Sequence, residues 1–176
     1  IYVKNFNLEH AFSSGTAELG GLFEESQCGM TLRDCQYNGS VVLLADSTAL
    51  IGERTTFSGP ELYADGLNVF SNHAHISLEQ CAIDGFTANG IAINSVEAVT
   101  NFESVDVSNS DGHGFVIPFG NAEISIDEMA IEACGKTGIS AGENSNLDAI
   151  GLRVTNNQEH GLLLDEDTQA AISFSL

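Results

Sequence analysis

The sequence has few basic residues, only two prolines and no tryptophan. Five Lys and Arg residues stand against 25 Asp and Glu residues, so the formal net charge is −20 at pH 7. Such a chain lacks the positive face that binds nucleic-acid phosphates or an anionic membrane surface. No stretch approaches the roughly 18 consecutive apolar residues of a membrane-spanning helix. We therefore expect neither a nucleic-acid partner nor membrane insertion.

The composition instead indicates one folded domain. Hydrophobic residues make up 43% of the 176 residues, too many for an intrinsically disordered chain and enough for one buried core. With 18 glycines and two prolines, the turns must rely on Gly and Asn. No segment shows helical periodicity beyond about one turn. We expect a single all-β domain that covers residues 1–176.

An apolar pattern recurs along the chain at an almost constant interval. From Ile76 to Ile83, apolar residues occupy relative positions 0, 2, 5 and 7. Segments with equivalent spacing begin at Met30, Thr100, Ile124 and Leu147. From Ile76 onward the intervals are 24, 24, 23 and 25 residues, whereas 46 residues separate Met30 from Ile76. That gap equals two repeats of 23 residues, with an irregular repeat around Ile51 and Phe57.

A second pattern runs in register with the first. Six repeats carry a residue pair ending in glycine, and after the later pairs two apolar residues follow two positions apart, as in Asn89-Gly90 with Ile91 and Ile93. The other pairs are Asn38-Gly39, Asp65-Gly66, His113-Gly114, Thr137-Gly138 and His160-Gly161. Alternating apolar residues indicate a short strand with one buried face. Because glycine takes positive φ freely and Asn, Asp and His tolerate it, each pair predicts a left-handed turn.

Short strands that recur every 23–24 residues without hairpin turns predict a solenoid. Equivalent strands of successive coils stack in parallel about 4.8 Å apart. One internal column would contain Cys35, Cys81, Val105, Met129 and Leu152. The chain length corresponds to about seven coils. A β-sandwich is the alternative all-β fold, but it would give irregular strand spacing and alternating strand directions.

Three turn-and-strand segments carry a family resemblance: Asn-Gly-Ile-Ala-Ile at 89–93, Asp-Gly-His-Gly-Phe-Val-Ile at 111–117 and Glu-His-Gly-Leu-Leu-Leu at 159–164. They resemble the right-handed parallel β-helix superfamily, the pectate-lyase-like fold, and the likeness covers nearly the whole chain. The segments at 15–22 and 30–35 also look like repeats of bacterial surface adhesins and polymorphic outer-membrane proteins. The resemblance implies a right-handed coil, but this fold does not determine an activity.

Acidic residues follow the second apolar position in three successive repeats, at Glu79, Glu103 and Asp127. Stacking would place their carboxylates about 5 Å apart, a spacing at which like charges repel or recruit a cation. Oxygen ligands suit Ca²⁺, so these residues are a candidate calcium site, and no other cofactor is expected. The alternative is an acidic face open to solvent. A second acidic cluster at 165–167 is expected to be a charged loop.

A histidine occupies the same turn position at His113 and His160, two repeats and about 10 Å apart. The Gly-His-Gly around His113 resembles one motif of the polygalacturonase-type glycoside hydrolases. A catalytic role would pair Asp111 with Asp84 or Glu159 as the two carboxylates and make His113 an acid–base group. The alternative is a turn-forming histidine, since the Asn-Thr-Asp, Asp-Asp and Arg-Ile-Lys motifs of that family are absent.

Polysaccharide lyases of this fold resemble one another in using Lys or Arg with Ca²⁺ on an anionic substrate. A net charge of −20 repels uronate chains unless cations bridge them. Three tyrosines and no tryptophan leave few aromatic platforms for sugars.

His73 and His75 flank Ala74 and can point the same way, but two histidines are a weak metal signal.

The four cysteines, Cys28, Cys35, Cys81 and Cys134, fit no zinc motif. Cys35 and Cys81 share a column but lie two coils apart, too far for a disulfide. Cys28 and Cys35 could meet only if the bend folds them together. We expect buried thiols that fill the core, while the fold and the acidity favour an extracellular location.

The chain begins and ends on equivalent strands, which suggests a fragment of a longer solenoid, a subunit that stacks through open coil ends, or irregular caps. We expect a non-enzymatic extracellular or cell-surface module with a structural or adhesive role. Its partners would be further copies, in a homo-oligomer or filament, or a cell-surface or glycan ligand. The alternatives are a glycoside hydrolase or polysaccharide lyase, and a non-catalytic glycan-binding module.

Overall fold

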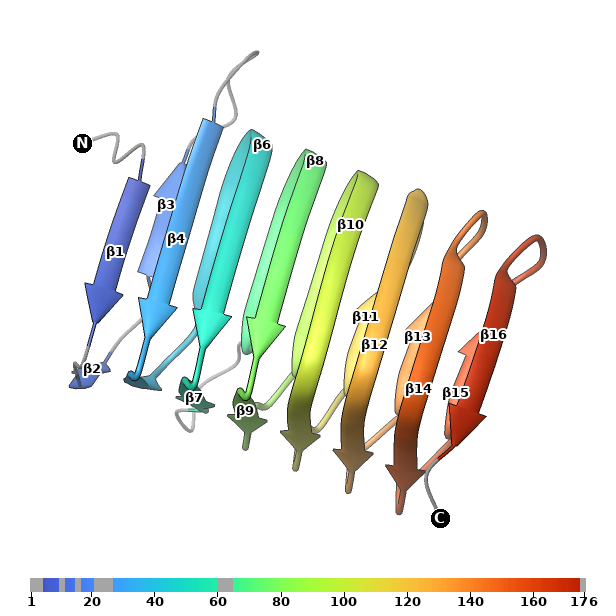
Figure 1. Cartoon of the computed structure of the whole chain (residues 1–176). Coiled ribbons are helices and arrows are strands. Elements are labelled where there is room, and N and C mark those ends of the chain that lie inside the picture. The colour runs from blue at the N-terminus through green and yellow to red at the C-terminus, as the bar shows by residue number, and fades with distance from the viewer. Residues whose placement is uncertain (1–4, 10–11, 15–16, 21–26, 60–64, 175–176) are drawn as a thin grey trace.

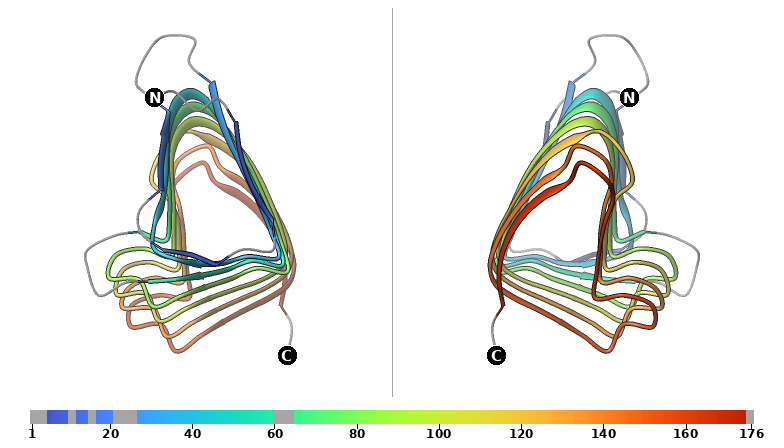
Figure 2. Two further views of the ribbon diagram at one scale, coloured as in Figure 1. Left: turned by 90° about the vertical axis from the view of Figure 1, so that its left-hand side faces the viewer. Right: turned by 90° about the vertical axis from the view of Figure 1, so that its right-hand side faces the viewer.

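The structure is a computed structural model that describes residues 5–9, 12–14, 17–20, 27–59 and 65–174. Within these ranges every regular element is a β-strand, which confirms the all-β prediction. The strands wind around a common axis, and Figure 2 shows that the cross-section has three sides. The coils follow one another in chain order along the axis (Figure 1). The predicted solenoid is confirmed, with a coil number close to the expected seven.

The first face of the solenoid, in front in Figure 1, is a ladder of eight strands. They are, in spatial order, β1 (Asn5–Glu9), β4 (Gln27–Arg33), β6 (Val41–Glu53), β8 (Leu67–Glu79), β10 (Ile91–Ser108), β12 (Asn121–Glu132), β14 (Asn146–Thr155) and β16 (Gln169–Phe174). Several of these strands are long enough to continue around a corner onto a neighbouring face (Figure 2). All strands therefore join into one sheet.

The second and third faces consist mostly of three-residue strands. The second face contains β2 (Phe12–Ser14), β5 (Gln36–Asn38), β7 (Thr56–Ser58) and β9 (Ala82–Asp84), followed by the ends of β10, β12 and β14. The third face contains β3 (Ala17–Gly20), the beginnings of β6, β8 and β10, and then β11 (Phe115–Ile117), β13 (Ile139–Ala141) and β15 (Leu162–Leu164). Each coil thus contributes one strand to each face.

Every strand pairing between the described residues is parallel. The irregular repeat is also explained. Met30 pairs with Leu50, 20 residues later, and Leu50 pairs with Ile76 after 26 more, which together make the 46 residues between Met30 and Ile76. A short coil is therefore followed by a long one, and equivalent apolar residues stay in register.

The bend between the first and second faces requires a left-handed backbone, as does the end of the second face at Gly85, Asn109, Ala133 and Asn156. Positive φ values recur in the bend at Asp34, Arg54, Gln80, Ser104 and Glu128, between 47° and 59°, and at Gly151, with 68°. These residues stack in successive coils and mark the point at which the chain leaves the first face. The prediction that placed left-handed turns at the pairs ending in glycine is wrong from Asp65 onward, because neither residue of those pairs has positive φ.

Gly90 and Gly114 are needed because successive coils approach closely. A Cβ added at Gly114 would lie 2.4 Å from Ile131 Cγ2 and 2.8 Å from the carbonyl oxygen of Gly138. A Cβ at Gly90 would lie 2.5 Å from Val107 Cγ1. All three distances are too short for a Cβ to be accommodated. The absence of a Cβ, rather than backbone freedom, therefore selects glycine at these two positions.

The core is a stack of side-chain columns inside the coil. The predicted column is present: Val105 pairs with Met129, and backbone hydrogen bonds place Thr55 between Cys35 and Cys81. All four cysteines lie in the described ranges, are buried and form no disulfide. Burial raises the pKa of the Cys81 thiol and likewise that of Cys28 and Cys134. The thiols therefore serve as core residues, as expected.

Candidate functional site

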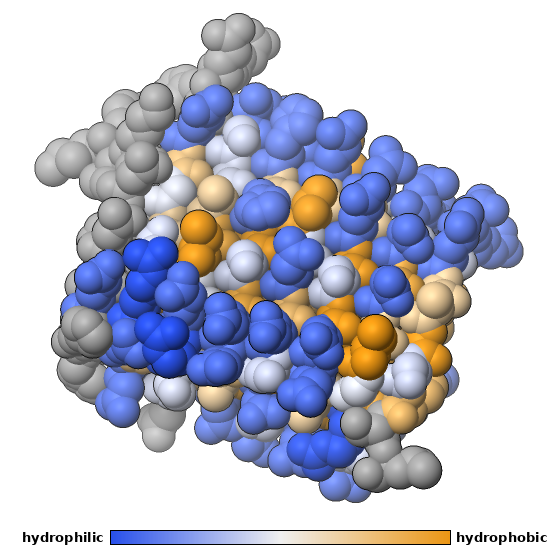
Figure 3. Space-filling view, in the orientation of Figure 1, coloured by the Kyte–Doolittle hydropathy of each residue, from blue (hydrophilic) through white to orange (hydrophobic). Residues whose placement is uncertain are grey.

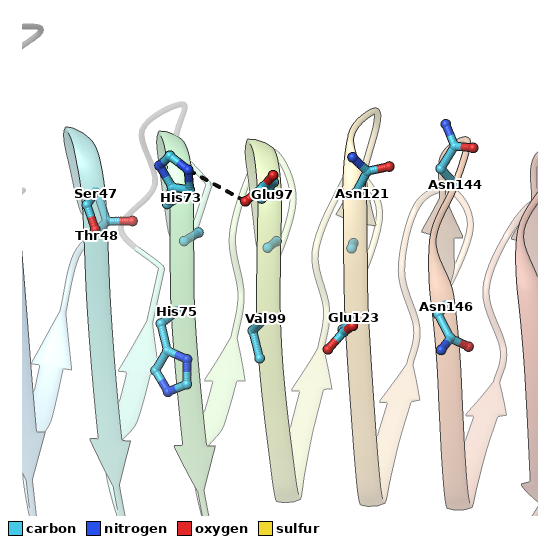
Figure 4. A pocket seen from close by; sticks show the side chains of 13 residues that line it. Ser47, Thr48, His73, His75, Glu97, Val99, Asn121, Glu123, Asn144 and Asn146 are labelled. Carbon is cyan, nitrogen blue, oxygen red and sulfur yellow. Dashed lines mark ion pairs between the residues drawn. The ribbon is translucent and has the colours of Figure 1, made fainter. Parts of the chain in front are cut away.

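A groove crosses the first face between two rows of outward-pointing side chains (Figure 4). It runs from β6 across β8, β10 and β12 to the start of β14, and its volume is about 490 Å³. Since neighbouring strands lie about 4.8 Å apart, five strands span about 19 Å. Figure 3 shows that polar side chains cover most of this face and that apolar surface lies between them. The groove is thus elongated along the solenoid axis.

The two rows of the groove are columns of residues in register. Ser47, His73, Glu97, Asn121 and Asn144 form the upper row in Figure 4. His75, Val99, Glu123 and Asn146 form the lower row. On β8, β10 and β12, the upper residue precedes its lower counterpart by two positions, so both side chains point outward from the same strand. The groove is lined by imidazoles, carboxylates and amides.

The floor of the groove lies over the residues between the two rows. Thr48, Ala74, Ala98 and Ala122 occupy these positions, and each is at most 5% exposed. Their side chains face the interior, in keeping with the alternation along a strand, so the backbone forms the floor. Both edges of β8, β10 and β12 are already paired to neighbouring strands. The floor therefore has no free strand edge for a ligand to pair with.

The electrostatics of the groove are dominated by Glu97 and Glu123. The Nε2 atom of His73 lies 3.5 Å from Oε2 of Glu97, an ion pair only when the imidazole is protonated (Figure 4). The two side chains are 60% and 62% exposed, so the pair adds little to stability and both groups are open to a ligand. In the part of the chain that the structure describes, no Lys or Arg lines the groove.

The acidic residues predicted as a calcium site form one stripe on the first face, below the groove. Strand pairing places Glu53 beside Glu79, Glu79 beside Glu103, and Glu103 beside Asp127. Within the described ranges, no group of three or more His, Cys, Asp or Glu side chains is arranged to hold a metal ion. Calcium binding by the stripe stays a prediction.

Arginines partly neutralise this stripe at its N-terminal end. Arg33 lies 3.0 Å from Glu53 and 3.4 Å from Glu9. Arg54 forms a bidentate pair with Asp34, its Nη2 atom 2.9 Å from Oδ2. Hydrogen bonds and charge from these carboxylates raise the pKa of both guanidinium groups. The positive charge at this end is therefore already engaged by protein carboxylates.

Two smaller grooves lie on the second face and share Ser104 and Asp106. Their volumes are about 260 and 360 Å³. Arg153 lines one of them and Arg54 lines the other. Arginines thus border the second face, whereas the groove of the first face has none.

The residues predicted for a catalytic site cluster around the turn between the second and third faces. Asp84 accepts hydrogen bonds of 2.7 Å from Ser108 Oγ and Asn109 Nδ2, so its carboxylate is engaged. Asp111 is exposed, and its backbone N–H donates to the carbonyl oxygen of Phe86. Glu159 is exposed and accepts a bond of 3.5 Å from Thr137 Oγ1. Asp84, Asp111 and Glu159 are not among the residues that line the three grooves described above.

His113 is held in the turn by neighbouring coils. Its backbone N–H donates to Asn89 Oδ1 over 2.9 Å, and its Nδ1 atom is buried without a hydrogen-bond partner. Burial lowers the pKa of His113, and Lys136 lowers it further, while Glu159 and the Thr137 backbone oppose the shift. His113 and Glu159 are therefore close enough to interact, although they do not line a groove described here.

Sequence reasoning identified His73 and His75 but missed the rest of the groove. The remaining residues could have been found by applying the 24-residue repeat to outward-facing positions. A step of 24 residues from His73 reaches Glu97, and a second step reaches Asn121. Applying the repeat in this way requires knowing which strand face is outward and which two outward columns border a hollow. The repeat predicts the columns, but the groove depends on side-chain size.

The comparisons with known proteins address the fold. Searches of curated proteins and of solved structures found no match. In the described part of the chain, no helix is long and apolar enough to span a membrane. Residues 65–174, more than half of the 176 residues, match the family model of the right-handed β-helix region. The expected handedness follows from this match, and the chain belongs to the right-handed β-helix family.

Proposed function

We propose that this chain is a non-enzymatic adhesive module of the cell surface or extracellular space, which binds an extended glycan in the groove of the first face. The observation that carries the proposal is the groove itself, elongated across five strands and lined on both sides by side chains that are polar except for Val99. Sugar hydroxyls both donate and accept hydrogen bonds, and the Asn, His and Glu side chains of the groove offer complementary groups.

The chemistry of the lining favours binding without turnover. Glu97 and His73 are both more than half exposed, whereas catalytic carboxylates act best in sites that exclude water. The residues predicted for catalysis lie at another corner of the solenoid, away from this lining. A rigid parallel sheet also holds the rows at a fixed spacing, which lowers the entropic cost of ordering the site when a ligand binds.

The adhesive role extends to self-association along the axis. Leu162, Leu164 and Ile172 continue the core columns of Ile139, Ala141 and Ala149, yet they are only partly buried. Phe174 is 59% exposed. Among the described residues, β15 and β16 each pair with one strand only. We propose that strands of a second copy cover this edge in a head-to-tail contact, which leaves the groove accessible.

Binding and turnover are tested with a panel of immobilised polysaccharides. The protein is expected to be retained by at least one glycan and to release no reducing ends from it. The double variant Asn121→Ala/Asn146→Ala should weaken retention about tenfold, because two polar contacts are lost. Asn101→Ala, an exposed residue outside the lining, is the matched control. Absence of retention by every glycan, or unchanged retention by the double variant, would overturn the proposal.

Self-association is tested separately by light scattering over a range of protein concentrations. The apparent mass is expected to rise with concentration, and Leu164→Lys should suppress that rise because it places a charge at the open core edge. Asp148→Lys, on an outward position of β14, is the control for added charge. A constant monomer mass at all concentrations would refute the head-to-tail contact and leave glycan binding standing.

A further inference from the structure

The charge of the groove differs in kind from that of the other exposed grooves. Among the described residues that line it, the only formally charged ones at neutral pH are Glu97, from β10, and Glu123, from β12. The described arginines are elsewhere: Arg33 and Arg54 are paired to carboxylates at the bend, and Arg153 lies on the second face. A ligand in the groove therefore meets carboxylates and amides without a competing fixed positive charge.

We propose that the groove selects a glycan that carries free amino groups, and that His73 competes with those groups for Glu97. This inference rests on the proposed function and names the class of glycan. An ammonium group that reaches a carboxylate makes a charge-assisted hydrogen bond, which is about twice as strong as a neutral one. A uronate chain would instead meet two carboxylates and a net charge of −20.

The two carboxylates are placed to act on different units of one chain. Glu97 is in the upper row and Glu123 is in the lower row of the next strand (Figure 4). One strand spacing of about 4.8 Å and two residues of about 3.3 Å each separate their backbones by roughly 8 Å along a diagonal. Asn121 and Asn146 flank this diagonal and remain available for hydroxyl groups. A linear ligand can thus present one amino group to each carboxylate.

The groove is better suited to an aminoglycan than to a basic peptide. Extended peptides are commonly bound by adding a strand to a sheet edge. The strands under the groove, β8, β10 and β12, are paired on both sides. Recognition must therefore come from outward side chains alone, which suits a ligand that carries its polar groups around its whole circumference.

Competition by His73 follows from its contact with Glu97. Protonation of the imidazole places a positive charge 3.5 Å from Oε2 of the carboxylate. Among the described residues, Asp46 precedes Ser47, the partner of His73 on β6, and His75 lies two positions along the same strand. An imidazole that carries a proton occupies the same carboxylate oxygen that an ammonium group of the ligand would contact. Removal of His73 should therefore strengthen binding of the amino form.

The test is calorimetric titration in mildly acidic buffer with oligomers of glucosamine, N-acetylglucosamine and galacturonate of equal length. The glucosamine oligomer is expected to bind about tenfold more tightly than the acetylated one, and the galacturonate oligomer should bind least. Glu97→Gln and Glu123→Gln should each weaken glucosamine binding about tenfold, whereas His73→Gln should strengthen it. Glu103→Gln, an exposed carboxylate on β10 outside the groove, is the matched control and should have little effect.

The outcomes separate the two proposals. Equal binding of the glucosamine and acetylated oligomers, or weakening by His73→Gln, would overturn selection for amino groups while glycan binding stands. No binding of any oligomer would remove both. Equal binding of an oligolysine peptide would show that charge alone is read and would also overturn the inference. All variants replace exposed side chains, and circular dichroism checks that each one folds.

Discussion

The carboxylate of Asp65 holds Asn89, its counterpart in the next coil, by two hydrogen bonds. Oδ1 of Asp65 accepts from both the backbone N–H and the side-chain Nδ2 of Asn89, each over 2.9 Å. Asn89 in turn accepts from the backbone N–H of His113 over 2.9 Å. The turn residues of three successive coils are thus linked into a ladder that supplements the strand pairing.

Breaking this ladder should destabilise the solenoid. Asn89→Ala removes an acceptor from the N–H of His113 and a donor to Asp65, at a cost of about 1–3 kcal/mol in the free energy of unfolding. Urea denaturation measures the change. Asn101→Ala, at an exposed position of β10, should change the free energy by less than about 0.5 kcal/mol. An equal effect of both variants would show that the ladder contributes no specific stability.

The close approach of successive coils at the glycines of the repeated pairs predicts a contrast between two alanine variants. A Cβ at Gly138 would lie 2.5 Å from Val154 Cγ1 and 2.7 Å from the carbonyl oxygen of Gly161. At Gly161 its nearest neighbour would be Val154 Cγ1 at 3.6 Å, an ordinary contact. Gly138→Ala should therefore lower the free energy of unfolding by about 1–3 kcal/mol, and Gly161→Ala should leave it nearly unchanged. Comparable thermal midpoints for the two variants would contradict this explanation.

The half-buried imidazole of His113 predicts a pH dependence. Burial lowers the pKa of His113 below the ordinary value of 6.5, so the folded state holds this proton less well than the unfolded state. The stability that this residue contributes is complete above pH 6.5 and falls as the pH drops through 6.5 toward the lowered pKa. His113→Gln should flatten that part of the stability curve, measured by urea denaturation.

The matched control for this prediction is His160→Gln. His160 occupies the equivalent turn two coils later and is exposed. Its replacement should leave the slope below pH 6.5 as in the parent protein. If the two variants change the slope equally, the burial of His113 is not its cause.

The acidic stripe predicts a salt-dependent gain in stability. Glu103 lies between Glu79 and Asp127 in the strand ladder. Glu103→Gln therefore removes the like-charge repulsion between residue 103 and both of these neighbours. The thermal midpoint should rise in low salt, and the gain should shrink near 1 M salt, where the Debye length is about 3 Å. A gain that is independent of salt would point to a local packing effect instead.

The calcium prediction is tested on the same residues. Addition of Ca²⁺ should raise the thermal midpoint of the parent protein more than NaCl of equal ionic strength does, because a divalent ion can bridge stacked carboxylates. Glu103→Gln should abolish that excess. Glu166→Gln, in the exposed loop at 165–167, should retain it. Identical responses to both salts would remove calcium from the description of this stripe.

Much of the fold could be predicted from the sequence because a solenoid is locally encoded. Each apolar position stacks on its counterpart about 24 residues away, so the spacing of Ile76, Thr100 and Ile124 predicts the register that the strands adopt. The stacking of Glu79, Glu103 and Asp127 followed from the same arithmetic. The error concerned Gly90 and Gly114, for which local turn chemistry suggested positive φ although contacts between coils select glycine.

The sequence by itself determined the all-β class, the coil period, the core columns and the order in which the coils stack along the axis. All of these depend on a repeat that is visible in one dimension. The tertiary structure alone decided which outward columns border a hollow. The backbone at Ala74, Ala98 and Ala122, whose side chains face the interior, forms the floor between two rows of longer, mostly polar side chains. A groove depends on the relative size of side chains that meet only after the chain has wound around its axis, and the period carries no information on that.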